Sequence, residues 1–420
     1  MSLGIGNATA RTFMSLRRHY NYRLYFFGQV VSISGTWMQS VAQAWFVVQN
    51  THSPLAVGIL AVCQFGPYGL FGLFGGAVAD RLDQRKVLLG TQAAFMVTAA
   101  LLAGLTLTGH ATVWEVYVIA GVTGMITVLD TPVRQAFTIQ MVGRDELPNA
   151  VALNSSLFNA SRIVGPAIAG GLIAVAGVGI CFLINALSYL AVLAALWLMR
   201  VHDLFPVSRD QRHENLLRGS LEGLKFAWRK PVIRSVLVMM LVIATVSINF
   251  NVLLPVLASR TLNSGPGIFG ILSALFGFGA LVGALFSASL GRASRRTMII
   301  GAAMFSVSEI ALAPLSVAWA AGLALVVTGI AFTLYSSQAN ATLQLAVTDQ
   351  MRGRVLGIYG YVFFGTAPLG GLLAGWLAEV GGTKLAFLVA GLIAAAATIY
   401  GWADTGRAAR ASTPPIAQVA

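Results

Sequence analysis

Charged residues are scarce in this chain of 420 residues, and their scarcity excludes an ordinary soluble protein. Only 10% of the residues are charged, whereas soluble domains typically have about 25%. Hydrophobic residues make up 57% of the chain. They come in runs of about 20 residues, the length that a helix needs to cross a ~30 Å hydrocarbon core. The composition predicts an all-α polytopic membrane protein.

Cysteine and histidine are also rare, with two and five residues respectively. Cys63 and Cys181 each lie inside an apolar run, so we expect buried free thiols and no disulfide. The histidines fall in loops or termini without the spacing of metal ligands. No glycine-rich loop ends in Lys-Ser or Lys-Thr, which excludes a self-contained ATPase. We therefore expect no enzyme, no metal and no cofactor, and energy supplied by an ion or substrate gradient.

Twelve apolar ranges predict twelve membrane-spanning helices. They are 24–48, 54–79, 87–108, 112–136, 149–176, 179–199, 232–258, 267–290, 297–315, 317–344, 353–378 and 383–402. A polar segment at 201–230 separates them into two groups of six. We therefore predict an N-terminal six-helix bundle (1–200), a cytoplasmic central loop (201–230), a C-terminal six-helix bundle (231–405) and a cytoplasmic tail (406–420).

Basic residues predict the orientation of the helices, because cytoplasmic loops carry an excess of Lys and Arg. With the N-terminus inside, the loops that receive nearly all bases are cytoplasmic. The exceptions are Arg260 and Lys384 in outer loops and Arg162 within a span. Both termini are therefore predicted to lie in the cytoplasm, and the chain is expected in a bacterial inner (plasma) membrane as a monomer.

The two halves repeat each other in sequence. Residues 54–60 (PLAVGIL) align with residues 266–272 (PGIFGIL), and the stretch from Asp80 to Gly90 aligns with that from Gly291 to Gly301. Two parallel six-helix repeats are typical of transporters that work by alternating access.

Several motifs resemble those of the major facilitator superfamily. Residues 76–86 (GAVADRLDQRK) resemble its signature loop between helices 2 and 3. Residues 130–136 (DTPVRQA) followed by 147–154 (LPNAVALN) resemble the drug- and siderophore-exporter branch, which includes enterobactin and macrolide efflux proteins. Residues 161–166 (SRIVGP) with Gly170 and Gly171 are similar to the helix-5 motif of the superfamily's antiporters. The resemblance covers nearly the whole chain and implies two six-helix bundles around a central path.

The signature loop supplies the predicted gating residues. Asp80 is expected to meet the positive N-terminal end of the helix near Gly353 and to latch the cytoplasmic side shut. Asp130 and Arg134 are four residues apart and can pair on one helix face. Gln84 stands where the superfamily often has a base, and Asp83 replaces a glycine. Arg81 or Arg85 would therefore have to be the base that interacts with Asp130. The gating set is therefore Gly76, Asp80, Arg81, Arg85, Asp130 and Arg134.

Polar stripes and isolated charges supply the other candidates. A charge at mid-bilayer costs at least about 2.5 kcal/mol unless it is paired or wet, so Arg162 is predicted to face a cavity and to suit an anionic or phenolate substrate. Asp130 and Glu309 are the candidates for proton coupling. Gly165, Pro166, Gly170 and Gly171 are expected to bend and pack helix 5. The remaining predicted cavity residues are Gln39, Gln43, Asn159, Asn249, Asn251 and Asn340.

These features predict a secondary active exporter of small amphipathic molecules, drugs or siderophore-like compounds, driven by proton antiport. The expected partners are a small-molecule substrate, protons and the lipid bilayer, with no nucleic acid. Two alternatives stay open. One is an uptake permease for a small metabolite on the same fold, and the other is a non-transporting membrane sensor.

Overall fold

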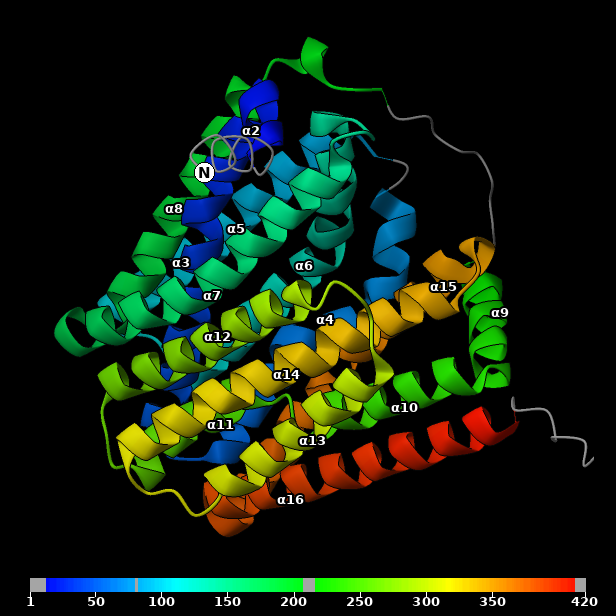
Figure 1. Ribbon diagram of the computed structural model, residues 1–420. Coiled ribbons are helices and arrows are strands. Elements are labelled where there is room, and N and C mark those ends of the chain that lie inside the picture. The colour runs from blue at the N-terminus through cyan, green and yellow to red at the C-terminus, as the bar shows by residue number, and fades with distance from the viewer. Residues whose placement is uncertain (1–12, 80–81, 207–215, 412–420) are drawn as a thin grey trace, which may run out of the picture.

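The computed structural model describes residues 13–79, 82–206 and 216–411, and this part of the chain is helical throughout, with no strand. Its helices form two groups (Figure 1). The N-terminal half contains α2 (Met14–Arg18), α3 (Tyr20–Thr51), α4 (Pro54–Ala79), α5 (Gln84–Leu107), α6 (Val113–Val142), α7 (Leu147–Ala176) and α8 (Val178–Leu198). A short 3-10 turn, Val201–Asp203, follows α8.

The C-terminal half has the same sequence of long helices with more interruptions. It contains α9 (Leu216–Arg229), α10 (Pro231–Val246), α11 (Phe250–Val256), the π-helical turn Leu257–Thr261, α12 (Pro266–Ser289), α13 (Arg295–Leu312), α14 (Ala318–Ala346), α15 (Asp349–Gly365) and α16 (Ala367–Ala411). Within α16 the chain turns back at Gly382, whose φ of 69° is a left-handed value that glycine adopts without strain.

The helices follow the predicted membrane spans closely. Nine stretches of the described residues are long and apolar enough to cross a membrane, and Met351–Asp404 holds two passes because of the turn in α16. The helices α3 and α13 occupy two further predicted ranges but fall outside this set. Both carry more polar and charged residues than their neighbours, among them Gln39 in α3 and Glu309 in α13.

The predicted span 232–258 is broken into α10 and α11 at residues 247–249. Asn249 precedes α11, and its side-chain amide donates to the Thr245 carbonyl at 2.9 Å. Side chains of this kind compete with the helical hydrogen bonds of the backbone. Phe250 and Asn251, which directly follow the break, line the central pocket described below.

The segment 201–230 is not a loop throughout. Its second half forms α9, which packs on α15: the side chain of Arg354 donates to the Glu222 carboxylate at 2.8 Å. Pro231 ends this helix, because the residue before a proline avoids the helical region; Lys230 is extended, with φ −105° and ψ 106°. In Figure 1, α9 crosses the direction of α10.

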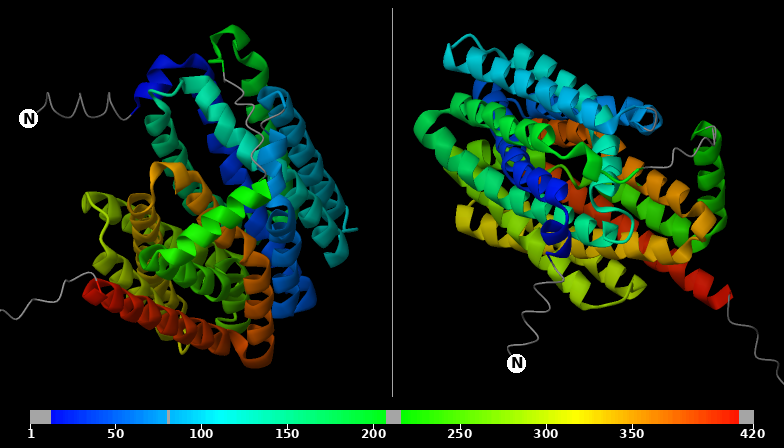
Figure 2. Two further views of the ribbon diagram at one scale, coloured as in Figure 1. Left: turned by 90° about the vertical axis from the view of Figure 1, so that its right-hand side faces the viewer. Right: turned by 90° about the horizontal axis from the view of Figure 1, so that it is seen from above.

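The two halves pack on each other at one end of the molecule. We call the end that carries Arg18, Arg144, Arg200 and Lys230 the basic end, and the opposite one, where α3 ends and α4 begins, the far end. Contacts between halves join α7 to α12, α4 to α15 and α16, and α11 to α3 and α4. Figure 2 shows the two bundles from two further directions.

One face of α7 shows how the contact between the halves changes along the molecule. Nearest the basic end, Val151 and Phe158 expose 51% and 46% of their surface. One turn later Arg162 lines the central pocket. Towards the far end, Pro166 and Gly170 are buried. The interface is therefore closed at the far end and open at the basic end.

The helices of the opposite half show the same gradient. On α12, Phe276 is buried whereas Leu285, nearer the basic end, is 64% exposed. On α15, a methyl group added to Gly353 or Gly357 would meet no atom within 4 Å. Gly365, further along the same helix, places its carbonyl oxygen 3.0 Å from a methyl group added to Gly69 of α4.

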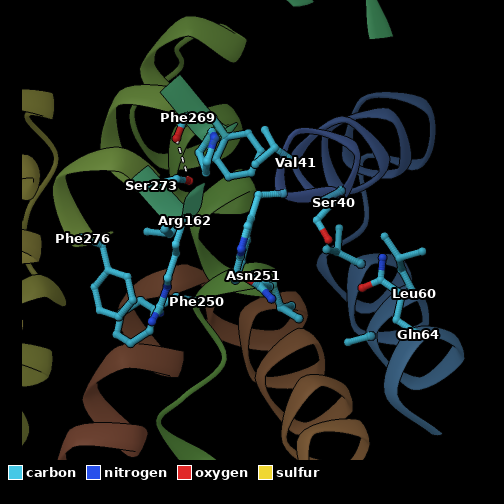
Figure 3. Close-up of a pocket in the computed structure, with 17 residues that line it drawn as sticks. Ser40, Val41, Leu60, Gln64, Arg162, Phe250, Asn251, Phe269, Ser273 and Phe276 are labelled. Atoms are coloured by element: carbon cyan, nitrogen blue, oxygen red, sulfur yellow. Dashed lines mark hydrogen bonds between the residues drawn. The ribbon is translucent and has the colours of Figure 1, made fainter. Parts of the chain in front are cut away.

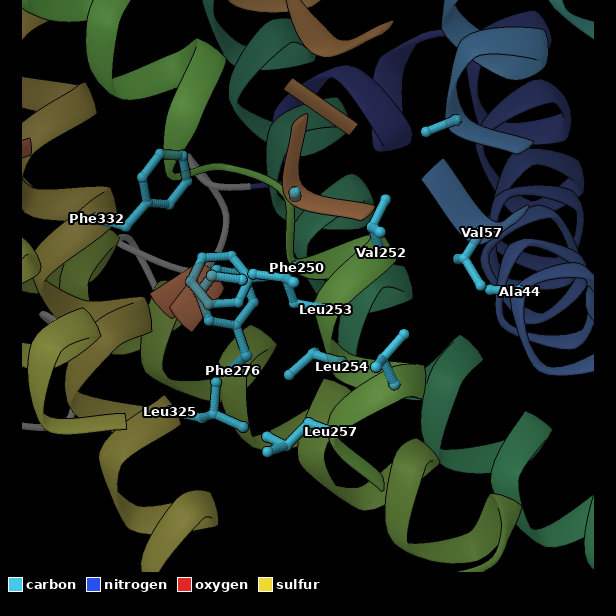
Figure 4. Close-up of a cluster of buried hydrophobic side chains, with 14 of the residues drawn as sticks. Ala44, Val57, Phe250, Val252, Leu253, Leu254, Leu257, Phe276, Leu325 and Phe332 are labelled. Carbon is cyan, nitrogen blue, oxygen red and sulfur yellow. The ribbon is translucent and has the colours of Figure 1, made fainter. Parts of the chain in front are cut away.

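The main hydrophobic core lies mostly in the C-terminal half and extends through the interface into the N-terminal half (Figure 4). Phe250 of α11 stacks on Phe276 of α12 with ring centroids 4.4 Å apart, and Phe276 is followed by Phe332 of α14. Aromatic pairs of this kind contribute about 0.5–1.5 kcal/mol beyond the burial of their area. They fix the broken helix α11 against α12 beside the central pocket.

Candidate functional site

A pocket lies between the two halves (Figure 3). Its volume is about 620 Å³, which includes space open to solvent. The N-terminal half contributes residues of α3, α4 and α7, and the C-terminal half contributes residues of α11 and α12. The pocket therefore lies between two bundles whose interface is closed at the far end and open at the basic end.

Among the described residues that line this pocket, Arg162 is the one with a charge. Its guanidinium carbon lies 4.8 Å from the ring centroid of Phe276 in the opposite half and 5.8 Å from that of Trp37 on α3. Such contacts attract a cation to the faces of aromatic rings. In the described part of the chain no carboxylate forms a salt bridge with Arg162. The guanidinium therefore keeps its hydrogen-bond donors available on the pocket side.

Neutral polar groups and apolar surfaces complete the lining. Asn251, Gln64, Ser40 and Ser273 are the uncharged polar side chains, as Figure 3 shows. The remaining side chains are mostly aliphatic or aromatic. This combination suits an amphipathic molecule whose polar part is anionic or electron-rich and whose body is apolar.

The structure places five of the seven predicted cavity residues away from the lining of this pocket. Gln39 is buried between helices, and its side-chain oxygen accepts from the Asn185 amide of α8 at 2.7 Å. Gln43 lies behind the wall and accepts from Gln64 at 2.9 Å. Asn249 packs next to Gly370 of α16. These three side chains join helices, which a polar stripe in the sequence cannot distinguish from a cavity.

Asn159 and Asn340 bond within their own helices instead. The Asn159 amide donates to the Ser155 carbonyl at 2.8 Å, and the Asn340 oxygen accepts from Gln344 at 2.6 Å. Both are half-buried and lie on the basic-end side of the pocket. Of the predicted cavity residues, Arg162 and Asn251 are the two that line the pocket.

The glycines of the helix-5 motif allow two different close approaches. A methyl group on Gly165 would lie 2.6 Å from Trp37 Cβ, so this glycine lets α7 approach α3. A methyl group on Gly170 would lie 2.8 Å from the Cα of Gly270 on α12. Gly171 faces open space, with no atom within 4 Å. Pro166 lines the pocket.

Asp130 and Arg134 form the predicted pair within a larger buried network. The carboxylate of Asp130 accepts from both Nε and Nη2 of Arg134 on one oxygen. Its other oxygen accepts from Thr91 and Gln92 of α5, at 2.7 and 2.8 Å. Arg134 also donates to Gln29 of α3 at 2.6 Å. The network thus ties α6 to α5 and α3 inside the N-terminal half.

The other predicted gating residues are distributed differently. Arg85 does not reach Asp130; its Nε donates to the Leu196 carbonyl near the end of α8, at 2.9 Å. Asp83 caps α5 by accepting from the backbone NH of Lys86. Gly76 lies within α4. Asp80 and Arg81 lie outside the described residues.

Glu309 of α13 is fully buried in the C-terminal half, and neither carboxyl oxygen has a hydrogen-bond partner in the described part of the chain. It lies beside Ser247, the residue after α10, whose hydroxyl donates to the Ala390 carbonyl. A buried carboxylate without a partner is costly.

Polar contacts also join the halves at the far end. The Glu379 carboxylate of α16 accepts from the Ser53 hydroxyl at 2.8 Å and from the backbone NH of Leu55 at 3.3 Å. It thereby sits at the N-terminus of α4, where the helix dipole favours a negative charge. Arg260 donates to the His52 carbonyl nearby. These contacts can form only while the far end is closed.

Sequence reasoning missed Trp37, Gln64, Phe250, Ser273 and Phe276 as pocket residues. The aromatic side chains look like ordinary core residues in an apolar run. Gln64 and Ser273 are single polar residues without a stripe around them. The one available signal was that Gln64 is the only amide side chain within the predicted span 54–79.

The known proteins that this chain resembles are membrane transporters. The family described as transmembrane secretion effector matches residues 10–411. The staphyloferrin A transporter of Staphylococcus aureus is 26% identical over 88% of this chain and 92% of its own. The multidrug efflux pump Tap of Mycolicibacterium fortuitum is 28% identical over 88% and 92%. Macrolide efflux protein A of Streptococcus pyogenes is 24% identical over 90% and 95%.

Solved structures agree on the fold. A bacterial homologue of the human lysosomal transporter Spinster superposes with a TM-score of 0.72 at 13% identity, covering 92% of this chain and 97% of that one. A POT family transporter in complex with 5-aminolevulinic acid gives a TM-score of 0.75 at 10% identity, over 93% and 96%. The predicted all-α transporter fold is confirmed. The chain belongs to the transmembrane secretion effector family of major facilitator transporters.

Proposed function

We propose that this protein exports amphipathic organic molecules with an anionic or electron-rich group, and that Arg162 binds that group. The observation that carries the proposal is the position of Arg162 in a pocket between the two halves, against aromatic rings and without a carboxylate partner among the described residues. The relatives named above are, by their names, a staphyloferrin A transporter, a macrolide efflux protein and a multidrug efflux pump. Macrolide efflux and multidrug efflux by two of these relatives support export of organic molecules with an apolar body.

The orientation of the chain follows from its bases in this proposal. The basic end faces the cytoplasm of a bacterial cell, with both termini inside, because positively charged loops remain on that side. The described conformation is then open to the cytoplasm and closed to the outside. Substrate would enter from the cytoplasm, contact Arg162 and displace the guanidinium from Phe276. Rocking of the two halves would then open the far end.

Proton antiport is the proposed source of energy, and Glu309 fits it better than Asp130. Both oxygens of Asp130 already accept hydrogen bonds, so protonation would break at least one of them. Glu309 has no bonded donor to lose in the described part of the chain. It does not line the pocket, so its coupling to substrate would pass through the packing of the C-terminal bundle.

Binding to the purified protein tests the role of Arg162. The probe is a pair of fluorescent aromatic compounds that differ only in a carboxylate or its neutral amide. A hydrogen bond to a charged group contributes about 1.5–3 kcal/mol, so Arg162→Gln should weaken binding of the carboxylate roughly 10- to 150-fold. Binding of the amide should change little.

Arg162→Lys and Arg144→Gln are the controls. The lysine variant keeps the charge and should retain part of the discrimination between carboxylate and amide. Arg144 is exposed in the loop after α6, and its replacement should leave binding unchanged. Equal weakening of carboxylate and amide by Arg162→Gln would mean that the pocket had collapsed, and would contradict a charge-specific role.

A further inference from the structure

The helix α9 has an exposed face that neither the pocket nor the packing of the halves explains. It lies between the two halves in sequence, directly before α10. One face carries Leu221, Leu224 and Trp228, which expose 58%, 44% and 59% of their surface. These residues are three and four apart, so they form one continuous stripe along the helix. We call it the α9 stripe.

The opposite face of α9 is used for packing on α15. A methyl group on Gly223 would lie 3.0 Å from Arg354 Cβ, and Ala227 is fully buried. The Glu222 carboxylate, beside this face, accepts from Arg354. The helix is therefore fixed to the C-terminal half by one side, and the α9 stripe faces outwards.

Bases flank the stripe. Lys225, Arg229 and Lys230 are all exposed, whereas Glu222, the acid of this helix, pairs with Arg354. Leucine and tryptophan on one face with Lys and Arg beside them are typical of helices that lie in the plane of a membrane interface. Tryptophan in particular is enriched at the level of the lipid headgroups.

The position of α9 in the fold agrees with such a location. Its last residue is separated from Pro231, the first residue of the membrane-spanning α10, by Lys230 alone. The helix crosses the direction of α10 instead of extending it (Figure 1). α9 therefore adjoins the end of a membrane span, and the interface of the bilayer lies at that level.

We propose that the α9 stripe inserts into the headgroup region of an anionic bilayer, with Lys225, Arg229 and Lys230 on the lipid phosphates. The alternative partner that could cover the α9 stripe is the N-terminal half of the same chain, which would approach α9 when the basic end closes. Among the described residues, its basic end has a net positive charge that would repel the bases of α9: it carries seven bases (Arg17, Arg18, Arg23, Arg85, Lys86, Arg144 and Arg200) and four acids (Asp83, Asp145, Glu146 and Asp203). A surface of anionic lipid is complementary to α9 in charge, and the N-terminal half is not.

Spin labelling of the full-length protein in vesicles tests the location of the stripe. A nitroxide is attached to Leu221→Cys, and to Asp145→Cys as a control in the exposed loop after α6. The wild-type protein, treated in the same way, gives the background from Cys63 and Cys181. The vesicles contain phosphatidylcholine alone or mixed with phosphatidylglycerol.

The collision rates of the label with oxygen, which enters lipid, and with a water-soluble nickel chelate decide the outcome. At position 221 we expect high oxygen and low nickel accessibility in phosphatidylglycerol vesicles, and the reverse at position 145. Replacing Lys225, Arg229 and Lys230 together by Gln should return position 221 towards the values in pure phosphatidylcholine. High nickel accessibility at position 221, or low accessibility to both reagents as in a protein–protein contact, would overturn the proposal.

Discussion

The contact between Gly170 and Gly270 offers a direct way to shift the conformation of this transporter. Gly170→Ala adds one methyl group at the far-end seal between α7 and α12. Its Cβ would lie 2.8 Å from Gly270 Cα and 3.0 Å from the Pro266 carbonyl oxygen. Both are backbone atoms, so no flexible side chain can move away to make room. The substitution therefore penalises the conformation in which the far end is closed.

The size of this effect follows from the cost of overpacking. One extra methyl group in a closely packed contact costs typically about 1–3 kcal/mol, which corresponds to roughly a 5- to 150-fold change in an equilibrium between two states. When the far end opens, the two helices separate and the penalty disappears. Gly170→Ala should therefore populate the conformation that is open at the far end.

Distances between pairs of spin labels measure this shift. Labels at His110 and Ser316 report on the far end, and labels at Arg144 and Arg292 report on the basic end; all four sites are exposed in loops. Gly170→Ala should lengthen the first distance and shorten the second. Gly171→Ala is the matched control, because its methyl group meets no atom within 4 Å. The same distances in Gly170→Ala and wild type would refute the reasoning.

Three further predictions concern carboxyl groups. Glu379→Gln should favour opening of the far end by only roughly 2- to 5-fold in the same distance measurement, because a charge at an exposed helix N-terminus contributes about 0.3–1 kcal/mol; a shift as large as that of Gly170→Ala would contradict this assignment. Asp130→Asn should lower the thermal unfolding temperature of the purified protein, because it removes the buried carboxylate that accepts from Arg134, and a hydrogen bond to a charged group contributes about 1.5–3 kcal/mol. The double variant with Arg134→Gln should recover part of that loss, and no recovery would exclude a pair. Glu309→Gln should leave substrate binding intact but abolish the response of transport to a pH gradient in vesicles; an unchanged response would remove Glu309 as the proton carrier.

The sequence predicted the helical passes well because their signal is local. Runs such as 179–199 are apolar over a whole membrane thickness, and α8 covers Val178–Leu198. The break between α10 and α11 was not predicted, since 232–258 was interpreted as one continuous span and its polar residues Asn249 and Asn251 were assigned to a cavity. It depends on the bond from Asn249 to the Thr245 carbonyl and on the aromatic stacking of Phe250.

The candidate site was only partly predictable, because the side chains that form it come from distant parts of the chain. Arg162 was identified from the cost of an isolated charge in a membrane span. Gln39 was expected in the cavity but bonds to Asn185, a residue 146 positions away. Phe276 contacts Arg162 from the other half of the molecule. A single sequence gives the type of each side chain, and the fold decides which of them meet.

Transport into everted vesicles tests the central claim most directly. These vesicles expose the cytoplasmic face, and a pH gradient, acidic inside, would drive the proposed export into the lumen. Wild-type vesicles should accumulate the fluorescent aromatic carboxylate, and vesicles with the same amount of the Arg162→Gln protein should not. Equal accumulation by the two proteins, or none by the wild type for carboxylate and amide alike, would contradict a transport path through the Arg162 pocket.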